Sequence, residues 1–222
     1  MSAYQLIRRL PSRQNRVWLV RDLLQDQLNV EKYFCCQAAY ERELRLLLAM
    51  NQQNLAVPRL LATGRLLIRM QYIHAPTACD WLAQAEQRKQ QVDDALLAAI
   101  CRLLKQIHEL PLFAGQQWRL HDVNLRNILI NSEANSVYWL DFEQAGPGRP
   151  LDDAADLIAF LLTYQPAMTE YKRELARRLC DQLQHSFCFP AGDLDQAILA
   201  ALCRIDVRRR TSWLDAFSGF SH

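Results

Sequence analysis

The first third of the chain alternates apolar and polar residues in short runs, which are separated by polar or turn-forming residues. This two-residue period is typical of half-buried β-strands, and three successive runs with short connections predict an antiparallel meander. Residues 37–51, rich in Ala, Leu, Glu and Arg, predict a helix after the third strand. The five strands are predicted at residues 4–10, 16–21, 28–34, 59–62 and 65–73.

From residue 77 onward the apolar residues recur at helical spacing instead. Helices are predicted at residues 79–85, 91–110, 152–164, 169–187 and 193–217, around one β-hairpin with strands at 128–130 and 137–140 and a turn at 131–135. The pattern predicts an α+β, bilobal fold. Its parts are a small five-stranded antiparallel sheet lobe with one helix, residues 1–73, and a mostly helical C-terminal lobe, residues 74–222.

Polar residues interrupt the apolar pattern at the central hairpin. Asp122 and Asn127 lie in the loop that leads into the hairpin, and Asp141 ends its second strand. The strand residues between them are apolar enough to be buried. Acids at the rim of a buried hairpin are unfavourable unless they meet a cation. The hairpin therefore points to a cation at this end.

Two further charged residues lie in apolar surroundings in the first lobe. Lys32 lies between Val30 and Phe34 on one face of the third strand, either at an edge or pointing into a cleft. Glu43 falls on the apolar stripe of the helix at 37–51, where an unpaired carboxylate is unfavourable. Lys32 is the nearest candidate partner for Glu43. The alternative is a Glu43 that lies at the margin of the stripe and faces solvent.

Composition narrows the class of protein. Half of the 222 residues are hydrophobic and 23% are charged, as in ordinary globular domains, and a net charge of +2 gives no reason to expect a nucleic-acid or membrane partner. Residues 1–9 lack the apolar core of a signal peptide, and no run approaches the roughly 18 apolar residues of a membrane span. The seven cysteines form no Cys-x-x-Cys pair, which favours reduced, buried thiols over zinc or disulfides. A soluble, cytoplasmic protein is expected.

The charged and amide residues singled out above match the requirements of phosphoryl transfer. That reaction needs a lysine on the phosphates, a carboxylate that holds the lysine, ligands for Mg²⁺, and a carboxylate near the attacking hydroxyl. Lys32 and Glu43 supply the first two, and Asp122, Asn127 and Asp141 supply the others.

The same residues carry a resemblance to a known superfamily. The chain resembles the protein-kinase-like superfamily, and within it the aminoglycoside phosphotransferase/choline kinase group and the bacterial lipopolysaccharide sugar (Kdo) kinases. Val-Glu-Lys32 matches the lysine motif of the third strand, and Glu43 matches the helix glutamate. The segment from Asp122 to Asn127 matches the catalytic loop D-x-x-x-x-N, and Asp141-Phe-Glu matches the position of D-F-G.

The resemblance implies a role for each matching residue. Lys32 would contact the α- and β-phosphates of ATP and be oriented by Glu43. Asp122 would position the acceptor hydroxyl and take its proton, while Asn127 and Asp141 would hold Mg²⁺, which prefers oxygen ligands. A hinge that reads adenine through backbone groups would lie in Met-Gln-Tyr-Ile at 70–73. The implied nucleotide-binding residues are Lys32, Glu43, Gln71, Tyr72 and Ile73.

The chain departs from the family pattern at three places. Leu120 stands where a histidine or arginine usually precedes the catalytic aspartate, and a local structural role is expected for the neighbouring His121 rather than a catalytic one. Residues 11–16 replace the glycine-rich loop, with backbone amides and Arg13 or Arg16 as the expected substitutes. Glu143 replaces the glycine of D-F-G, and is expected in a supporting or solvated position rather than on the metal.

The acceptor side is less defined by the sequence. Only a short segment separates the helix that ends at residue 110 from His121, which favours an open acceptor site. For Asp152, Asp153 and Asp156, helix capping and contacts to the catalytic loop are favoured over binding of a cationic acceptor. The arginines at 204–210 are expected to form a solvated face rather than a site for an anionic acceptor.

We therefore expect an ATP- and Mg²⁺-dependent phosphotransferase, a kinase that acts on a hydroxyl of a small molecule or sugar. A protein serine/threonine kinase is the alternative within catalysis. A pseudokinase that binds nucleotide or a partner without turnover is the alternative outside catalysis. The complete set of motif residues favours activity, whereas the missing glycine-rich loop and Leu120 favour the pseudokinase.

Overall fold

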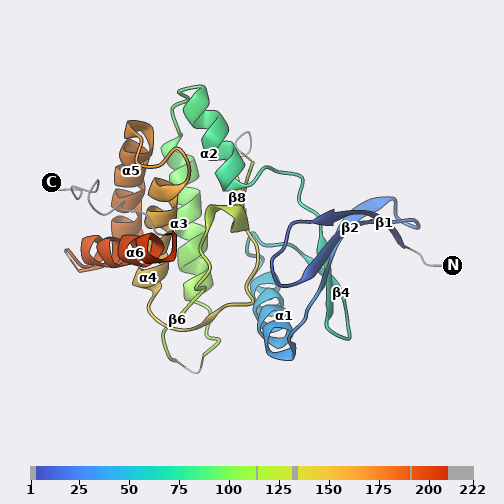
Figure 1. The fold of residues 1–222 in the computed structure, drawn as a ribbon. Coiled ribbons are helices and arrows are strands. Elements are labelled where there is room, and N and C mark those ends of the chain that lie inside the picture. Colours follow the sequence, from blue (N-terminus) through green and yellow to red (C-terminus); the bar gives the residue numbers. More distant parts are fainter. Residues whose placement is uncertain (1–3, 114, 132–134, 191, 210–222) are drawn as a thin grey trace. The chain divides into compact units, whose positions relative to one another are not determined.

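The chain divides into two compact units in the computed structural model (Figure 1). The structure describes residues 4–113, 115–131, 135–190 and 192–209. One unit consists of Met1–His74 with Tyr138–Ala145, and the other consists of Ala75–Val137 with Gly146–His222. The segment that carries Asp141 therefore belongs to the first unit, although it lies far along the chain.

The first unit is built on the five-stranded antiparallel sheet that the alternation predicts. Its elements are β1 (Tyr4–Leu10), β2 (Arg16–Asp22), β3 (Gln27–Tyr33), α1 (Gln37–Gln52), β4 (Leu60–Gly64) and β5 (Leu67–Gln71). The strand order is β1-β2-β3-β5-β4, so β3 lies at the centre of the sheet. The meander and the helix after the third strand are confirmed.

Burial in the first unit alternates along β5, whereas on β2 the successive residues Leu19 and Val20 are both buried. Val20 of β2, Ile68 of β5 and Leu46 of α1 are fully buried, so sheet and helix share one apolar core. The edge strand β1 is mostly exposed and carries Arg8 and Arg9. Charged residues on an edge strand discourage pairing with another chain.

The second unit is mainly helical, as predicted. Its helices are α2 (Ala78–Gln87), α3 (Asp94–His108), α4 (Pro150–Thr163), α5 (Glu170–Phe187) and α6 (Asp193–Arg209). Its short elements are β6 (Trp118–Arg119), the 3-10 helix η1 (Leu125–Asn127), β7 (Ile128–Asn131) and β9 (Gly146–Pro147). β8 (Ser136–Trp139) pairs with β7 and spans the point where the chain enters the first unit.

Some element boundaries differ from the prediction. α3 begins at Asp94, later than predicted, because the side chain of Asp93 accepts a hydrogen bond from the N–H of Ala95 and caps the helix there. The cap residue of α4 is Arg149, so the helix-capping role expected for the aspartates near its start is wrong. Residues 132–134 of the predicted turn and 210–217 of the last predicted helix lie outside the described residues.

α4 forms the centre of the second unit. Its residues Leu157, Ile158 and Leu162 are almost completely buried, and the helix packs against α5 and α6. A helix that is apolar on nearly all sides requires neighbours around it. None of the described helices is both long and apolar enough to cross a membrane.

The cysteines are all free thiols, but most are not buried. Cys101 and Cys180 lie in the core of the second unit, and burial raises the pKa of the Cys101 thiol to about 12. The expectation of buried thiols is wrong for the four exposed ones, which are Cys35, Cys36, Cys188 and Cys203.

Candidate functional site

Lys32 and Glu43 form a buried ion pair in the first unit. Lys32 lies on the central strand β3 opposite Ile68 of β5, and its Nζ is 2.6 Å from Oε2 of Glu43 on α1. Glu43 is 1% exposed. The predicted pairing is therefore confirmed, and the alternative of a solvated Glu43 is wrong. Buried charges of this kind are stable only when each has its partner.

The same ammonium group contacts two further carboxylates. Lys32 Nζ lies 2.8 Å from Asp141 Oδ1 and 3.3 Å from Glu143 Oε2. Burial by itself would lower the pKa of Lys32, but the charges of Glu43, Asp141 and Glu143 outweigh it and raise the pKa above its usual value. Burial raises the pKa of Glu43 to about 7, against the opposing effect of Lys32. One cation thus faces three carboxylates, which leaves an excess of negative charge.

This excess of charge suits a divalent cation. One oxygen from each of Glu43, Asp141 and Glu143 lies within 4.8 Å of the others, so the group can hold a metal ion. Mg²⁺ prefers such hard oxygen ligands. Asp141, one of the two ligands that the resemblance implies, belongs to this group, and the magnesium site itself stays a prediction. Glu143 is 6% exposed, so the solvated position considered for it is wrong.

Asn15 and Arg42 hold Glu143 in place. Asn15 lies in the loop between β1 and β2, its Nδ2 donates to Glu143 Oε2, and its Oδ1 accepts from the N–H of Cys35 at 3.3 Å. Arg42 Nε donates to the backbone oxygen of Glu143 at 2.7 Å. The sequence suggested Arg13 or Arg16 as a substitute for the glycine-rich loop. Both arginines are exposed whereas Asn15 is 5% exposed, so the loop residue directed into the site is the asparagine.

Two residues near the acids have a left-handed backbone. Their φ angles are 62° for Asp141 and 65° for His121. This conformation costs on the order of 1 kcal/mol in a residue with a side chain, and persists where the surroundings fix it. Lys32 holds the Asp141 carboxylate, and Asp153 accepts from the N–H of His121 at 3.1 Å. The His121 Nε2 is 3.1 Å from the oxygen of Pro147, in agreement with the expected local structural role.

Asp122 and Asn127 lie together in the second unit, on the loop that ends in η1. Asn127 Nδ2 donates to the backbone oxygen of Asp122 at 3.0 Å and to its Oδ2 at 3.1 Å. Asn124 Nδ2 donates to the other carboxylate oxygen at 2.7 Å. Two amides thus orient the Asp122 carboxylate. Among the described residues no donor bonds to Asn127 Oδ1, the oxygen that a metal would use.

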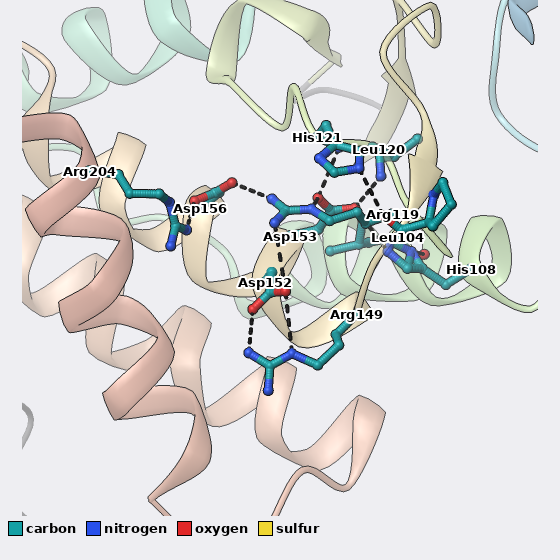
Figure 2. Close-up of polar contacts among 11 residues, drawn as sticks. Leu104, His108, Arg119, Leu120, His121, Arg149, Asp152, Asp153, Asp156 and Arg204 are labelled. Carbon is teal, nitrogen blue, oxygen red and sulfur yellow. Dashed lines mark hydrogen bonds and ion pairs between the residues drawn. The ribbon is translucent and has the colours of Figure 1, made fainter. Parts of the chain in front are cut away.

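The fully buried Asp153 of α4 holds the start of this loop (Figure 2). Its Oδ2 accepts from the N–H of Leu120 at 2.5 Å, and its Oδ1 accepts from the N–H of His121 at 3.1 Å. Arg119 Nε donates to Oδ1 at 3.0 Å. The expected contact between these aspartates and the catalytic loop is confirmed for Asp153.

His108 and Asp153 share one titratable proton. His108 Nδ1 lies 2.9 Å from the carbonyl oxygen of Leu104, which only accepts, so Nδ1 carries a proton. The 3.0 Å contact of Nε2 with Asp153 Oδ2 needs a second proton, which one of the two groups carries. Burial, with the charge of Arg119, lowers the pKa of His108 to about 4. Burial raises the pKa of Asp153 to about 7, against the opposing Leu120 N–H and Arg119.

Arginines already pair with the other two aspartates of this helix (Figure 2). Arg119 Nη2 is 2.5 Å from Asp156 Oδ2, and Arg204 Nη2 is 2.8 Å from Asp156 Oδ1. Arg149 Nη2 is 2.7 Å from Asp152 Oδ1. Because guanidinium groups balance these carboxylates, the arrangement disfavours a cationic acceptor at this place.

The remaining predicted residues lie at the end of the sheet. Gln71 ends β5, and its N–H donates to the oxygen of Arg59 at 2.9 Å. Within the described ranges no backbone hydrogen bond uses the N–H of Tyr72 or Ile73, which leaves these groups available to a ligand. Asp141 belongs to the first unit and Asn127 to the second, so their predicted sharing of one Mg²⁺ stays a prediction.

Sequence comparisons identify no relatives: no family model and no curated protein matches this chain. Among solved structures, the kinase PK-1 of Cydia pomonella granulovirus is similar, with a TM-score of 0.54 and 16% sequence identity over 65% of this chain. The similar part covers 55% of that kinase. Likeness at this identity shows the fold, so the predicted α+β, protein-kinase-like fold is confirmed. The narrower resemblance to the aminoglycoside phosphotransferase group stays a prediction.

Proposed function

We propose that the chain is an ATP- and Mg²⁺-dependent phosphotransferase, a kinase whose acceptor is a hydroxyl group of a small molecule or sugar. The observation that carries the proposal is the buried contact of Lys32 with Glu43 and Asp141. Phosphoryl transfer in kinases uses a strand lysine held by a helix glutamate, next to a metal-binding aspartate. The likeness in fold to a viral kinase supports the same activity.

The two parts of the chain would have different roles in the reaction. Residues 1–73 would form the nucleotide-binding lobe, in which Lys32, oriented by Glu43, binds the α- and β-phosphates. The backbone of residues 71–73 would bind adenine. Residues 74–222 would form the catalytic lobe with Asp122. The ion pairs and available backbone groups described above support this assignment.

Asp122 is the residue that acts on the acceptor. Its carboxylate accepts a hydrogen bond from the acceptor hydroxyl and takes the proton as the acceptor oxygen attacks the γ-phosphorus. The new P–O bond forms while the bond between the γ-phosphorus and the ADP oxygen breaks. Asn124 and Asn127 keep the carboxylate oriented through their amide groups. Asn127 and Asp141, with Glu143 close to Asp141, would hold Mg²⁺, which neutralises phosphate charge when bound.

A thermal-shift titration with ATP tests the proposal. ATP with Mg²⁺ at about 100 times its dissociation constant should stabilise the protein by about 2.7 kcal/mol. Lys32→Met should remove most of this stabilisation. Lys105→Met is the matched control, because Lys105 is an exposed lysine on α3 whose carboxylate partner, Glu109, is also exposed. The absence of any stabilisation by ATP, with or without metal, contradicts the proposal.

A phosphate-transfer assay with the same unmodified protein distinguishes a kinase from a pseudokinase. A kinase should transfer the labelled γ-phosphate of ATP to at least one member of a panel of hydroxyl-containing metabolites. Nucleotide binding together with no transfer to any metabolite or protein substrate, and no hydrolysis of ATP, identifies a pseudokinase. Transfer to protein serine or threonine alone identifies a protein kinase.

A further inference from the structure

Two guanidinium groups gather around the ring of Tyr164, in the same unit as Asp122. Tyr164 is the cap residue at the end of α4 and is half-buried. The Cζ of Arg126 lies 5.5 Å from the ring centroid, and the Cζ of Arg209 lies 6.0 Å from it. Arg126 comes from η1, directly before Asn127, whereas Arg209 comes from the end of α6. Residues far apart in the sequence thus bring two cations to one aromatic ring.

The position of Arg209 is fixed by the backbone of α4. Its Nη1 donates to the carbonyl oxygen of Thr163 at 2.8 Å. Arg208 lies beside it, with Cζ 5.6 Å from the ring centroid of Phe160. The end of α6 is therefore held against α4, although Arg208 and Arg209 are themselves exposed. The expectation of a solvated face agrees with the exposure of Arg204, Arg208 and Arg209, and the contacts with Thr163 and Phe160 are additional to it.

The charge at this place is not balanced by the described chain. Arg119, Arg149 and Arg204 each form ion pairs with aspartates, whereas no carboxylate of the described residues forms an ion pair with Arg126 or Arg209. Burial lowers the pKa of Arg209, and the like charges of Arg208 and Arg126 lower it further. Like charges held close together without an acid are stabilised by an anion.

The cationic pair is close to the proposed catalytic acid. Arg126 follows Asp122 by only four residues and lies on η1, at the end of the same loop. Burial raises the pKa of Tyr164, and the charge of Asp122 raises it further. Among the described residues the Asp122 carboxylate forms no ion pair with either arginine, and its oxygens accept hydrogen bonds from Asn124 and Asn127. A molecule with its anionic group at the arginines would therefore have its other end near Asp122.

We propose that Arg126, Tyr164 and Arg209 bind an anionic group of the acceptor, a phosphate monoester or a carboxylate, and so direct its hydroxyl to Asp122. This inference rests on the proposed phosphotransferase function. Guanidinium groups bind both kinds of oxyanion through paired N–H donors, and the tyrosine ring keeps the two planar groups in position. The acceptor class is thus a small hydroxyl compound with a fixed negative charge.

Binding of inorganic phosphate tests the site without nucleotide. Isothermal titration with phosphate at constant ionic strength should show binding to the unmodified chain, and Arg126→Gln and Arg209→Gln should each weaken it by about tenfold. Arg126→Lys, which keeps the charge, should restore part of the affinity. Arg102→Gln is the matched control, because Arg102 is exposed on α3 and forms no ion pair with the described residues. Absence of phosphate binding, or equal binding by all variants, overturns the proposal. A repeat with acetate distinguishes a phosphate site from a carboxylate site.

Transfer assays then distinguish failure of this inference from failure of the proposed function. Ribose, ribose 5-phosphate, glucose, glucose 6-phosphate and gluconate are compared as acceptors. The anionic compounds should be preferred, and Arg126→Gln should lower their kcat/KM more than that of the neutral sugars, whereas Arg102→Gln should change neither. Preference for neutral sugars by a protein that binds ATP overturns this inference alone. Phosphate binding by a protein that fails to bind ATP contradicts the proposed function and with it the acceptor role of the site.

Discussion

The backbone N–H of Leu120 donates to Oδ2 of Asp153 at 2.5 Å, across a sequence separation of 33 residues. This bond fixes the backbone of Leu120, which stands two residues before Asp122, where kinases usually have a histidine or arginine. Because Asp153 is fully buried, the loop is anchored to the core of its unit and not to the surface. The position of the proposed catalytic acid therefore depends on a helix that itself has no part in the chemistry.

Asp153→Asn should destabilise the protein by about 1–3 kcal/mol, because an amide NH₂ replaces one acceptor and leaves a buried N–H of Leu120 or His121 without its partner. Urea unfolding measures the change. Asp181→Asn, an exposed aspartate on α5, is the control and should change stability very little. Equal effects of the two substitutions would show that Asp153 does not anchor the loop.

His108→Gln should add a pH dependence of stability that the pair of His108 and Asp153 does not contribute in the unmodified protein. With a folded-state pKa of about 7, Asp153 contributes stability that is present at low pH and lost as the pH rises through that value. With a folded-state pKa of about 4, His108 contributes stability that is present above its ordinary 6.5 and lost as the pH falls through 4. Between about pH 4 and pH 6.5 the two contributions to the pH dependence of stability cancel. The reason is that His108 and Asp153 together bind one proton in the folded state and one in the unfolded state.

In the His108→Gln variant, only Asp153 of these two residues still makes the free energy of unfolding depend on pH. Its free energy of unfolding should therefore fall as the pH rises from about 4 to about 7, relative to the unmodified chain. Urea unfolding at a series of pH values in this range measures the slope. His185→Gln, at an exposed position on α5, should run parallel to the unmodified protein. A parallel curve for His108→Gln as well would rule out the shared proton.

Lys32→Met should destabilise the protein by about 3–5 kcal/mol at neutral pH, because it leaves the carboxylates of Glu43, Asp141 and Glu143 together without their cation. The loss should be smaller at low pH, where Glu43, whose pKa burial raises to about 7, takes up a proton. The double variant with Glu43→Gln should lose less than the sum of the two single variants, since a charge that needs Lys32 has been removed. Additive losses in urea unfolding would show that the pair is not coupled.

Asn15→Ala should destabilise the protein by about 1–3 kcal/mol, because the buried Glu143 loses the amide that donates to it. Gln14→Ala, at an exposed neighbouring position of the same loop, is the control. If Glu143 lies near a bound metal, the same variant should also weaken the Mg²⁺-dependent part of ATP binding, measured by titration. If Asn15→Ala is as stable as the Gln14→Ala control, the loop does not stabilise Glu143.

Asp122→Ala should lower turnover by about 10²–10⁴-fold while ATP affinity changes little, because Asp122 is assigned to the acceptor hydroxyl and not to the phosphates. Single-turnover transfer of the γ-phosphate and ATP titration measure the two quantities separately. Asp181→Ala serves as the control for loss of an aspartate. Persisting turnover in Asp122→Ala would overturn the assignment.

The sequence by itself determined the order of the elements and one part of the site. Alternation placed Lys32 on a strand, helical spacing placed Glu43 on an apolar face, and each charge in apolar surroundings required a partner. Such patterns can be read from the sequence because they depend only on residues that lie close together along the chain. They were sufficient to predict the buried ion pair, which the structure confirms. The kinase-like fold was implied by the resemblance that the motif residues carry, and the likeness in fold to the viral kinase confirms it.

Only the tertiary structure decided which other polar residues are directed inward. Asn15, His108 and Arg126 have ordinary polar surroundings in the sequence, and their partners lie on other elements: Asn15 meets Glu143, His108 meets Asp153, and Arg126 meets Tyr164. Burial and pairing of such residues depend on packing between elements, which the local period does not encode. The sequence therefore predicted a phosphotransferase, which stays a prediction, while packing determined which residues orient the acids and which arginines lie at Tyr164.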